Sequence, residues 1–166
     1  MSEYKDKFAS FGVRPDARFW CPPAGVCLSA FVLVTKNGTV LLGRIAKSEL
    51  WREKWNLPPT PTPWSEKWLI PACHLKYGEH PDEAARRIAK EMLELSSYDL
   101  KFLECQSHLG TLGHWDIIFI YQVQTKQEIK TPEWYTELTF KDPKEMDQED
   151  FARHHGDVLG EIRHWR

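Results

Sequence analysis

The sequence lacks any apolar run long enough to cross a membrane, and its first residues, MSEYKDKF, lack the apolar core of a signal peptide. It also lacks an excess of either charge, because 22 Lys and Arg stand against 24 Asp and Glu, for a formal net charge of −2. This balance argues against a general nucleic-acid or membrane surface. No long-period repeat is present, and 166 residues suit one domain with a sizeable core.

Cysteine is also scarce. Cys21, Cys27, Cys73 and Cys105 show no paired spacing typical of zinc ligands. We therefore interpret all four as reduced thiols of a cytoplasmic protein, a compartment in which disulfides are rare. A disulfide framework is the alternative.

Aromatic residues, by contrast, are abundant: eight tryptophans, five tyrosines and eight phenylalanines. Residues 1–25 alternate charged with aromatic side chains and end in Cys-Pro-Pro-Ala-Gly, which interrupts regular structure. We predict that this segment is an arm that packs on the domain, or on the second subunit of a homodimer. The domain itself is predicted at residues 26–166.

Apolar segments between turn-forming residues predict the strands. Val26–Val34 is almost entirely apolar, as in a buried strand, and Lys36-Asn37-Gly38 suits a tight hairpin turn because Asn-Gly tolerates positive φ. Further strands are predicted at Thr39–Ile45, Leu100–Cys105 and Trp115–Val123. Helices are predicted at Pro81–Leu95 and Asp147–Trp165, and Phe140–Met146 leads into a polar turn.

A segment rich in tryptophan and proline, at about residues 48–66, looks like an insertion. Glu53-Lys54-Trp55-Asn56-Leu57-Pro58 echoes the later Glu66-Lys67-Trp68-Leu69-Ile70-Pro71. One interpretation is a proline-stiffened loop whose tryptophans pack on the core. The other is a wall on which a base or sugar stacks, with Trp55 and Trp64 as the ligand-binding residues.

The stretch Trp68–Leu95 resembles the Nudix box. Its lead-in is Trp68-Leu69-Ile70-Pro71, and Gly78-Glu79-His80-Pro81-Asp82-Glu83-Ala84-Ala85 follows at the family's distance. With the first box glutamate set on Glu79, the box arginine falls on Arg87. The other key box positions fall on Cys73 and Glu94, in place of glycines, on Ile88, in place of a glutamate, and on Glu91 and Met92, in place of a Glu-Glu pair.

The resemblance implies a Nudix-like α/β/α sandwich with a mixed β-sheet. It also implies hydrolysis of a nucleoside-diphosphate-linked metabolite. In the family, Mg or Mn is held by carboxylates at the positions that Ile88, Glu91 and Met92 occupy in this sequence. Only Glu91 is acidic, so Glu91 is the candidate catalytic residue and metal ligand. Glu94 either shares one ion with it or is a solvated residue at the helix end. Magnesium requires oxygen ligands, so the usual site should be absent and the hydrolase activity weak or lost.

The box pair Glu79 and Arg87 is implied to be structural. In the family, this glutamate and arginine tie the loop to the helix by charge-assisted hydrogen bonds. The alternative is two exposed charges without mutual contact.

Histidines and later acids are further candidates for the site. His74, on the short strand of the box, could face a ligand or could be packed. His108 and His114 flank a glycine loop and could supply a general base. His80, His154 and His155 are expected at the surface. Asp116 and Glu137 are later acids that could assist a metal.

Three functions stay open. The first is a divergent Nudix protein that recognises a nucleoside-diphosphate-linked metabolite, with weak or lost hydrolysis. The second is a non-catalytic binding or interaction module on the same fold. The third is a GDP-sugar hydrolase with a single metal, because that branch of the superfamily also lacks a glutamate after the box arginine.

Overall fold

The computed structural model describes residues 10–11, 26–46, 66–109, 115–152 and 154–162. Trp55, Trp64, His114 and nearly all of the arm and the insertion lie outside this part of the chain. The strands are β1 (Ser10–Phe11), β2 (Val26–Lys36), β3 (Thr39–Ile45), β4 (Ala72–His74), β5 (Asp99–Leu109), β6 (Trp115–Gln124) and β7 (Tyr135–Lys141). The helices are α2 (Pro81–Arg87), η2 (Ile88–Met92), η3 (Pro143–Glu145), η4 (Gln148–Asp150) and α3 (His155–Glu161).

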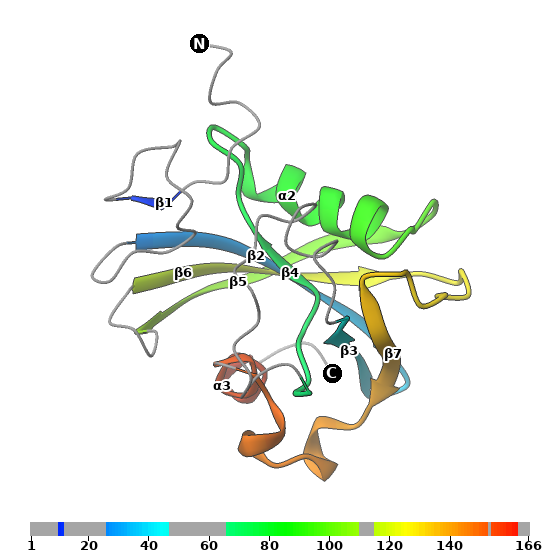
Figure 1. Cartoon of the computed structure of the whole chain (residues 1–166). Helices are drawn as coiled ribbons and strands as arrows, with labels where there is room; N and C mark the ends of the chain where they lie inside the picture. Colours follow the sequence, from blue (N-terminus) through cyan, green and yellow to red (C-terminus); the bar gives the residue numbers. More distant parts are fainter. Residues whose placement is uncertain (1–9, 12–25, 47–65, 110–114, 153, 163–166) are drawn as a thin grey trace.

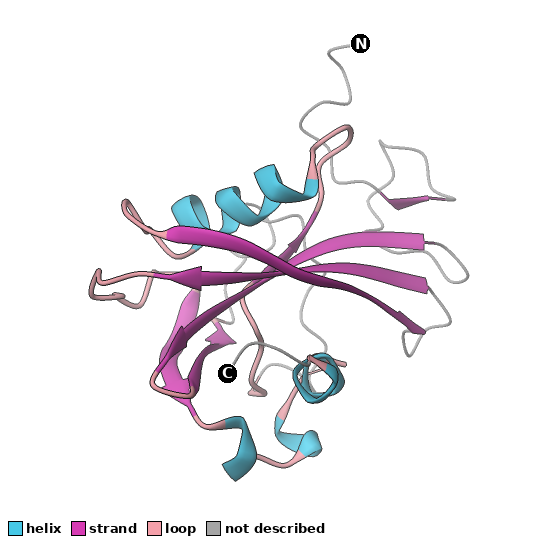
Figure 2. Ribbon diagram, turned by 180° about the vertical axis from the view of Figure 1, so that it is seen from behind, coloured by secondary structure: helices cyan, strands magenta, loops and turns pink. Residues whose placement is uncertain are grey.

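Strand β2 organises the sheet. It runs parallel to β6 and antiparallel to β1, β3 and β4, and the main strand order is β5-β6-β2-β3-β7. The β2–β3 hairpin turns at Asn37 and Gly38, whose φ angles of 50° and 81° are the positive values that the Asn-Gly pair was predicted to supply. The mixed sheet lies between α2 and η2 on one face and α3 on the other (Figures 1 and 2). The predicted α/β/α sandwich is therefore confirmed.

Alternation along the strands divides the interior into two cores. In β2, alternate residues such as Val32 and Leu33 point to opposite faces. The α2-side core contains Val32, Leu41, Ala84, Ala85, Ile88, Met92, Tyr121 and Trp134 among its members. The α3-side core contains Leu33, Leu42, Trp68, Ile70, Ile118, Ile120, Val158 and Leu159 among its members. Both helices are thus held to the sheet by burial of apolar surface.

Several elements differ from the prediction. Strand β5 continues to Leu109, since its hairpin with β6 pairs as far as Leu109 and Trp115. Strand β7 was not predicted, and it begins at Tyr135, where pairing with Ile45 starts. The last helix is shorter than predicted: α3 spans only His155–Glu161, and Asp147 caps the separate turn η4 through reciprocal bonds with Asp150.

The helix predicted at Pro81–Leu95 changes character partway. It is α-helical to Arg87 and continues as one wider π-turn, in which the Leu93 N–H bonds to the Ile88 carbonyl at 3.0 Å. Glu94 then adopts a left-handed φ of 55°, and the Leu95 N–H bonds back to Ala89 at 2.9 Å. The bond spans one residue more than in the Schellman termination, which has the same left-handed residue before the closing N–H and normally places glycine there.

Cys27 is disulfide-bonded, whereas Cys73 and Cys105 are free. The interpretation of all four cysteines as reduced thiols is therefore wrong. Among the described residues, none of the helices is both long and apolar enough to cross a membrane. The cytoplasmic location stays a prediction. Because Cys27 is disulfide-bonded, the cysteines no longer support it.

Candidate functional site

The loop before α2 is joined to the helix by a bidentate ion pair. Arg87 donates from Nε to Glu79 Oε1 at 2.7 Å and from Nη2 to Glu79 Oε2 at 2.9 Å. The same Nη2 donates to the His74 carbonyl at 2.9 Å, and the Lys76 N–H donates to Glu79 Oε2 at 2.7 Å. Gly78, at a φ of 77°, allows the turn that brings Glu79 to this position. The two side chains therefore fasten strand, loop and helix together.

Burial and hydrogen bonding oppose each other at this pair. For Glu79, burial would raise the pKa, but hydrogen bonds from Arg87 and from the Lys76 N–H outweigh it and hold the pKa below its ordinary value. For Arg87, burial would lower the pKa, but the hydrogen bonds to Glu79 outweigh it and raise the pKa. The shifts agree, so both groups are charged at neutral pH.

The N-terminus of α2 carries a cap that the sequence did not reveal. The Asp82 N–H donates to His80 Nδ1 at 3.2 Å, and the His80 N–H donates to Glu83 Oε2 at 3.1 Å. This is the reciprocal arrangement of a capping box, with histidine in the place usually taken by serine or threonine. His80 is exposed, as predicted.

Ile88 and Met92 are completely buried in the α2-side core. They are four residues apart, so they share one side of the helical segment, which faces the sheet. The Trp134 indole N–H donates to the Met92 carbonyl at 2.8 Å, which ties this segment to the loop before β7. Apolar packing thus fills this side of the helical segment.

The two acids of this segment lie on its solvent side. Glu91 and Glu94 are exposed, and the Glu94 carbonyl accepts a bond from Gln127 Nε2 at 3.0 Å. Within the described part of the chain, no three His, Cys, Asp or Glu side chains are arranged to hold a metal ion. The residues present therefore do not fit a multi-metal magnesium site.

His74 lies buried on β4 beside Ser29 of β2, and its Nδ1 is 3.1 Å from the serine Oγ. This contact belongs to the pairing of β2 with β4. A ligand role for His74 stays a prediction.

A polar cluster forms where α3 covers β5 and β6. Gln106 donates from Nε2 to Glu104 Oε1 at 2.7 Å and to the Val158 carbonyl at 3.3 Å. Its Oε1 is therefore the atom that faces His108 Nε2, at 2.9 Å. Neutral His108 must then carry its proton on Nε2, which leaves Nδ1 as the basic nitrogen.

His154 joins this cluster from the start of α3. Its Nε2 is 3.4 Å from Asp116 Oδ2, and its ring stacks on His108 with centroids 5.3 Å apart. His155 is buried, and its Nδ1 accepts the Ile70 N–H at 3.1 Å. The prediction that His154 and His155 are solvated is wrong, because α3 packs their rings against the sheet. Residues more than 40 positions apart meet here, so no local pattern could reveal the cluster.

Two cations meet at Trp68 on the β3–β7 side of the molecule. The Arg44 guanidinium lies 4.2 Å from the indole centroid, and Lys141 Nζ lies 4.5 Å from it. Glu137 lies 3.8 Å from Arg44 in a partly exposed ion pair. Trp68 itself is buried in the α3-side core. Its indole ring therefore makes cation–π interactions with both positive charges.

No protein-family model matches the sequence, and no curated protein matches it. Solved structures, however, share its architecture. A MutT Nudix hydrolase from Burkholderia pseudomallei aligns with a TM-score of 0.62 and 14% identity over 83% of this chain and 98% of that chain. A protein from Deinococcus radiodurans aligns with a TM-score of 0.64 and 12% identity, covering 84% and 83%. A Nudix-family hydrolase from Clostridium perfringens aligns with a TM-score of 0.53 and 17% identity, covering 82% and 94%.

The chain has the Nudix fold. Glu79 and Arg87, which match the box glutamate and arginine, form a bidentate ion pair, and their structural role as Nudix box residues stays a prediction. Ile88 and Met92, which align with two acidic positions of the box, are buried apolar residues. His80 and Trp134, by contrast, were missed as supports of the Nudix helix. A Ser or Thr at position 80 would have signalled the cap.

Proposed function

We propose that the protein is a divergent Nudix-fold protein that recognises a nucleoside-diphosphate-linked metabolite and has weak or no pyrophosphohydrolase activity. One observation carries the loss of activity: Ile88 and Met92 are fully buried where the Nudix box places metal-binding carboxylates. An apolar side chain cannot ligate magnesium, which takes oxygen ligands. Exposed Glu91 alone does not replace the set.

Recognition of a phosphate-bearing ligand is supported by Arg44 and Lys141. Phosphate oxygens favour charge-assisted bonds from such groups. Lys141 has no carboxylate ion pair among the described residues, and the Arg44 Nε is buried without a hydrogen-bond partner. Beyond the described residues, Trp55 and Trp64 remain the proposed stacking residues for the base or sugar, and His74 a proposed contact.

Catalysis is tested with a substrate panel. ADP-ribose, dinucleoside polyphosphates, nucleoside triphosphates and GDP-mannose are incubated with the protein and magnesium or manganese. We expect turnover far below the ~1–1000 per second of ordinary enzymes. Turnover in that range on any substrate would contradict the loss of activity. If only GDP-mannose were hydrolysed, and Glu91→Gln abolished the reaction, the single-metal hydrolase would replace our proposal.

Binding is tested separately by titrating the same compounds without metal and following tryptophan fluorescence and calorimetric heat. We expect saturable binding that Arg44→Ala and Lys141→Ala each weaken by about tenfold, the loss of one charge-assisted bond. Trp55→Ala or Trp64→Ala should cost roughly 1–3 kcal/mol, as for base stacking. Lys126→Ala, a distant exposed change, is the control.

The interaction module is the second candidate, and the exposure of Leu109 and Trp115 favours it. If no compound in the panel changes fluorescence or melting temperature, recognition of a nucleotide-type ligand is wrong and this module becomes the leading function.

A further inference from the structure

The hairpin of β5 and β6 carries an apolar surface that is separate from the Nudix helix. Tyr121 of β6 packs in the α2-side core. The β6 residues at positions 119, 117 and 115 lie two, four and six residues before it, so their side chains point to the same face. Each of them pairs in register with a residue of β5. The pairs are Cys105 with Phe119, Ser107 with Ile117, and Leu109 with Trp115. These six residues are called the hairpin stripe below.

The hairpin stripe is open to solvent at its outer end. Leu109 is 79% exposed and Trp115 50% exposed, although both are large and apolar. The stripe is ordered where it is exposed, since the Trp115 indole N–H donates to Ser107 Oγ at 2.6 Å. Phe102, further along β5, is 48% exposed and packs edge-on against Tyr121, which extends the apolar surface toward α2. Large apolar residues gathered in this way mark an interaction surface.

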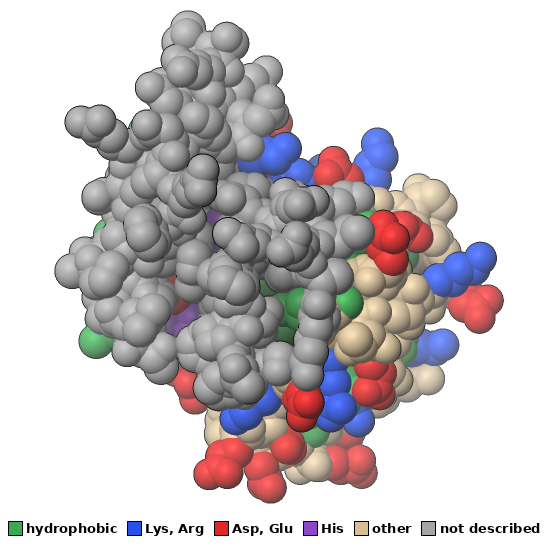
Figure 3. All heavy atoms as spheres, viewed as in Figure 1, with side chains coloured by type: hydrophobic (Ala, Val, Ile, Leu, Met, Phe, Trp, Pro, Cys, Tyr) green, Lys and Arg blue, Asp and Glu red, His purple; other side chains and the backbone are tan. Residues whose placement is uncertain are grey.

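The chemistry of the hairpin stripe restricts the partner. None of its six residues is charged, whereas Lys, Arg, Asp and Glu side chains are interspersed over the described surface in Figure 3. Nucleic acid and anionic membranes require basic residues, which the stripe does not supply. An identical stripe is neutral and apolar too, so two copies can meet about a two-fold axis without bringing like charges together.

The position of β5 also suits self-association. Among the described residues, β5 pairs only with β6, so it is an edge strand of eleven residues. Edge strands can pair with another chain, and an antiparallel pairing of two β5 strands would bring Cys105, Ser107 and Leu109 of the two copies side by side, with Trp115 of β6 next to this junction. The irregularity between Phe102 and Glu104 interrupts regular pairing at the other half of β5, which favours contact through the Cys105–Leu109 half.

We propose that the hairpin stripe is a homodimer interface in which β5 and the stripe of one copy meet those of a second copy. The contact does not involve Arg44, Lys141 or the Nudix helix. It is therefore independent of nucleotide recognition, and either proposal can fail without the other.

Sedimentation velocity of the full chain over a dilution series tests the interface. We expect a dimer that dissociates on dilution. Leu109→Asp and Trp115→Asp, made separately, should each weaken dimerisation by about tenfold or more, since each places a charge in or directly beside the apolar contact. Circular dichroism and the melting temperature identify a variant that has not folded.

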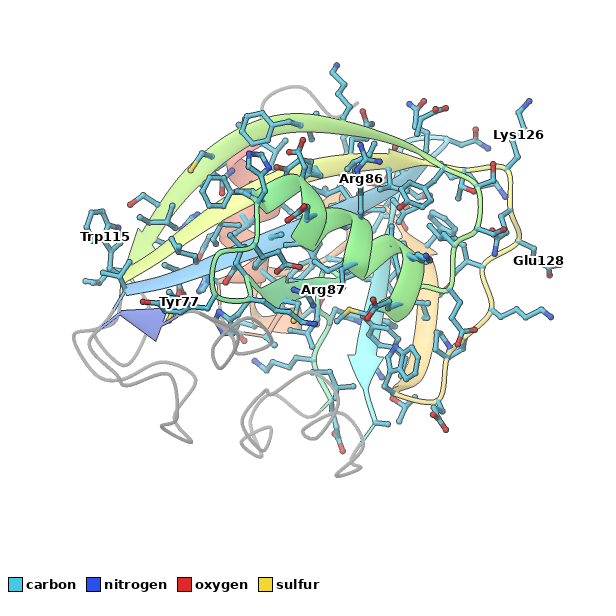
Figure 4. The ribbon with its side chains drawn as sticks, turned by 90° about the horizontal axis from the view of Figure 1, so that it is seen from above. Tyr77, Arg86, Arg87, Trp115, Lys126 and Glu128 are labelled. Atoms are coloured by element: carbon cyan, nitrogen blue, oxygen red, sulfur yellow. The ribbon has the colours of Figure 1, made fainter. Side chains whose placement is uncertain are left out.

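Lys126→Asp is the matched control, because Lys126 is exposed and lies at the opposite end of the molecule from Trp115 (Figure 4). It introduces the same residue and should leave the dimer unchanged. A wild-type chain that is monomeric at every concentration would overturn the proposal. A dimer that neither Leu109→Asp nor Trp115→Asp weakens would overturn it as well, because the interface would then lie elsewhere.

Cys105 supplies a test that needs no substitution in the stripe. Its thiol is exposed in the single chain, whereas Cys73 is buried. Maleimide labelling of Cys105, followed by peptide mass mapping, should be fast in dilute protein and several-fold slower where the dimer dominates. Equal labelling rates at both concentrations would contradict burial of the stripe.

Discussion

Glu94 adopts a left-handed backbone conformation, which glycine adopts more easily because it has no Cβ. Its φ of 55° lies in the left-handed region and ends the helical segment after η2, at a position that aligns with a glycine of the Nudix box. A residue with a Cβ is strained there by roughly 1–2 kcal/mol. The side chain is exposed and only the carbonyl takes part in the contact with Gln127, so glycine would lose little.

We therefore expect Glu94→Gly to raise the free energy of unfolding by ~1 kcal/mol in urea denaturation. Glu94→Ala is the control, because alanine keeps the strain and should give no such gain. Equal stability of the glycine variant and the parent would show that Glu94 is not strained.

The Glu79 carboxylate predicts a dependence of stability on pH. Its pKa in the folded chain is lower than the ordinary value of 4.5, owing to Arg87 and the Lys76 N–H, which outweigh the effect of burial. A depressed pKa stabilises the fold above the ordinary value, and this contribution is lost as the pH falls through the folded-state pKa.

Glu79→Gln should therefore lower the free energy of unfolding by about 2 kcal/mol at pH 7, since it leaves Arg87 without a charged partner. The difference between variant and parent should shrink as the pH is lowered from 4.5, where the parent carboxylate becomes protonated too. Urea denaturation of both proteins from pH 7 to pH 3 measures this difference in the free energy of unfolding. A difference that does not change with pH would contradict a charged Glu79–Arg87 pair.

At the scale of the element, α2 and η2 form a helix whose sheet-facing side is apolar, while the buried Arg87 is paired with Glu79. Ala84, Ala85, Ile88, Ala89 and Met92 are all buried in the α2-side core. Ile88 and Met92 of η2 are both buried, and the Trp134 indole N–H bonds to the Met92 carbonyl at the end of the segment. The helix thus works as a packing element.

We expect Ile88→Glu combined with Met92→Glu to destabilise the chain by roughly 3 kcal/mol or more, because two carboxylates would be buried without partners. Glu91→Gln, an exposed change in the same segment, should stay within about 0.5 kcal/mol of the parent. If the double variant keeps the parent's stability and binds magnesium, the segment is an open Nudix cleft and the packing account is wrong.

At the scale of the whole molecule, the fold is held by two apolar cores and by pairing around β2, and in the described part of the chain no three His, Cys, Asp or Glu side chains are grouped to hold a metal ion. A metal that bound the folded state would raise its melting temperature by mass action. We expect neither magnesium, manganese nor EDTA to change the melting temperature measurably. A rise with manganese that Glu91→Gln removes would instead indicate a single-ion site at Glu91.

Much of the fold was predictable because its signals are local. The apolar run of β2, the Asn37-Gly38 turn and the Pro81 helix start each depend on residues adjacent in the chain. The spacing of Glu79 and Arg87 within the Nudix frame was enough to predict their ion pair. The early end of the last helix was not predicted, since packing of α3 on the sheet and the separate turn η4 set its limits.

The sequence by itself determined strands β2, β3 and β6, the Asn37-Gly38 turn, the start of α2 and the apolar residue types at positions 88 and 92, because each is a property of residue type at short range. Only the tertiary structure decided that Ile88 and Met92 are buried and that His108, Asp116 and His154 meet under α3. It also decided that Leu109 and Trp115 remain exposed. Burial and proximity depend on which distant segments cover a side chain, and that follows from the packing of the whole sheet with its helices.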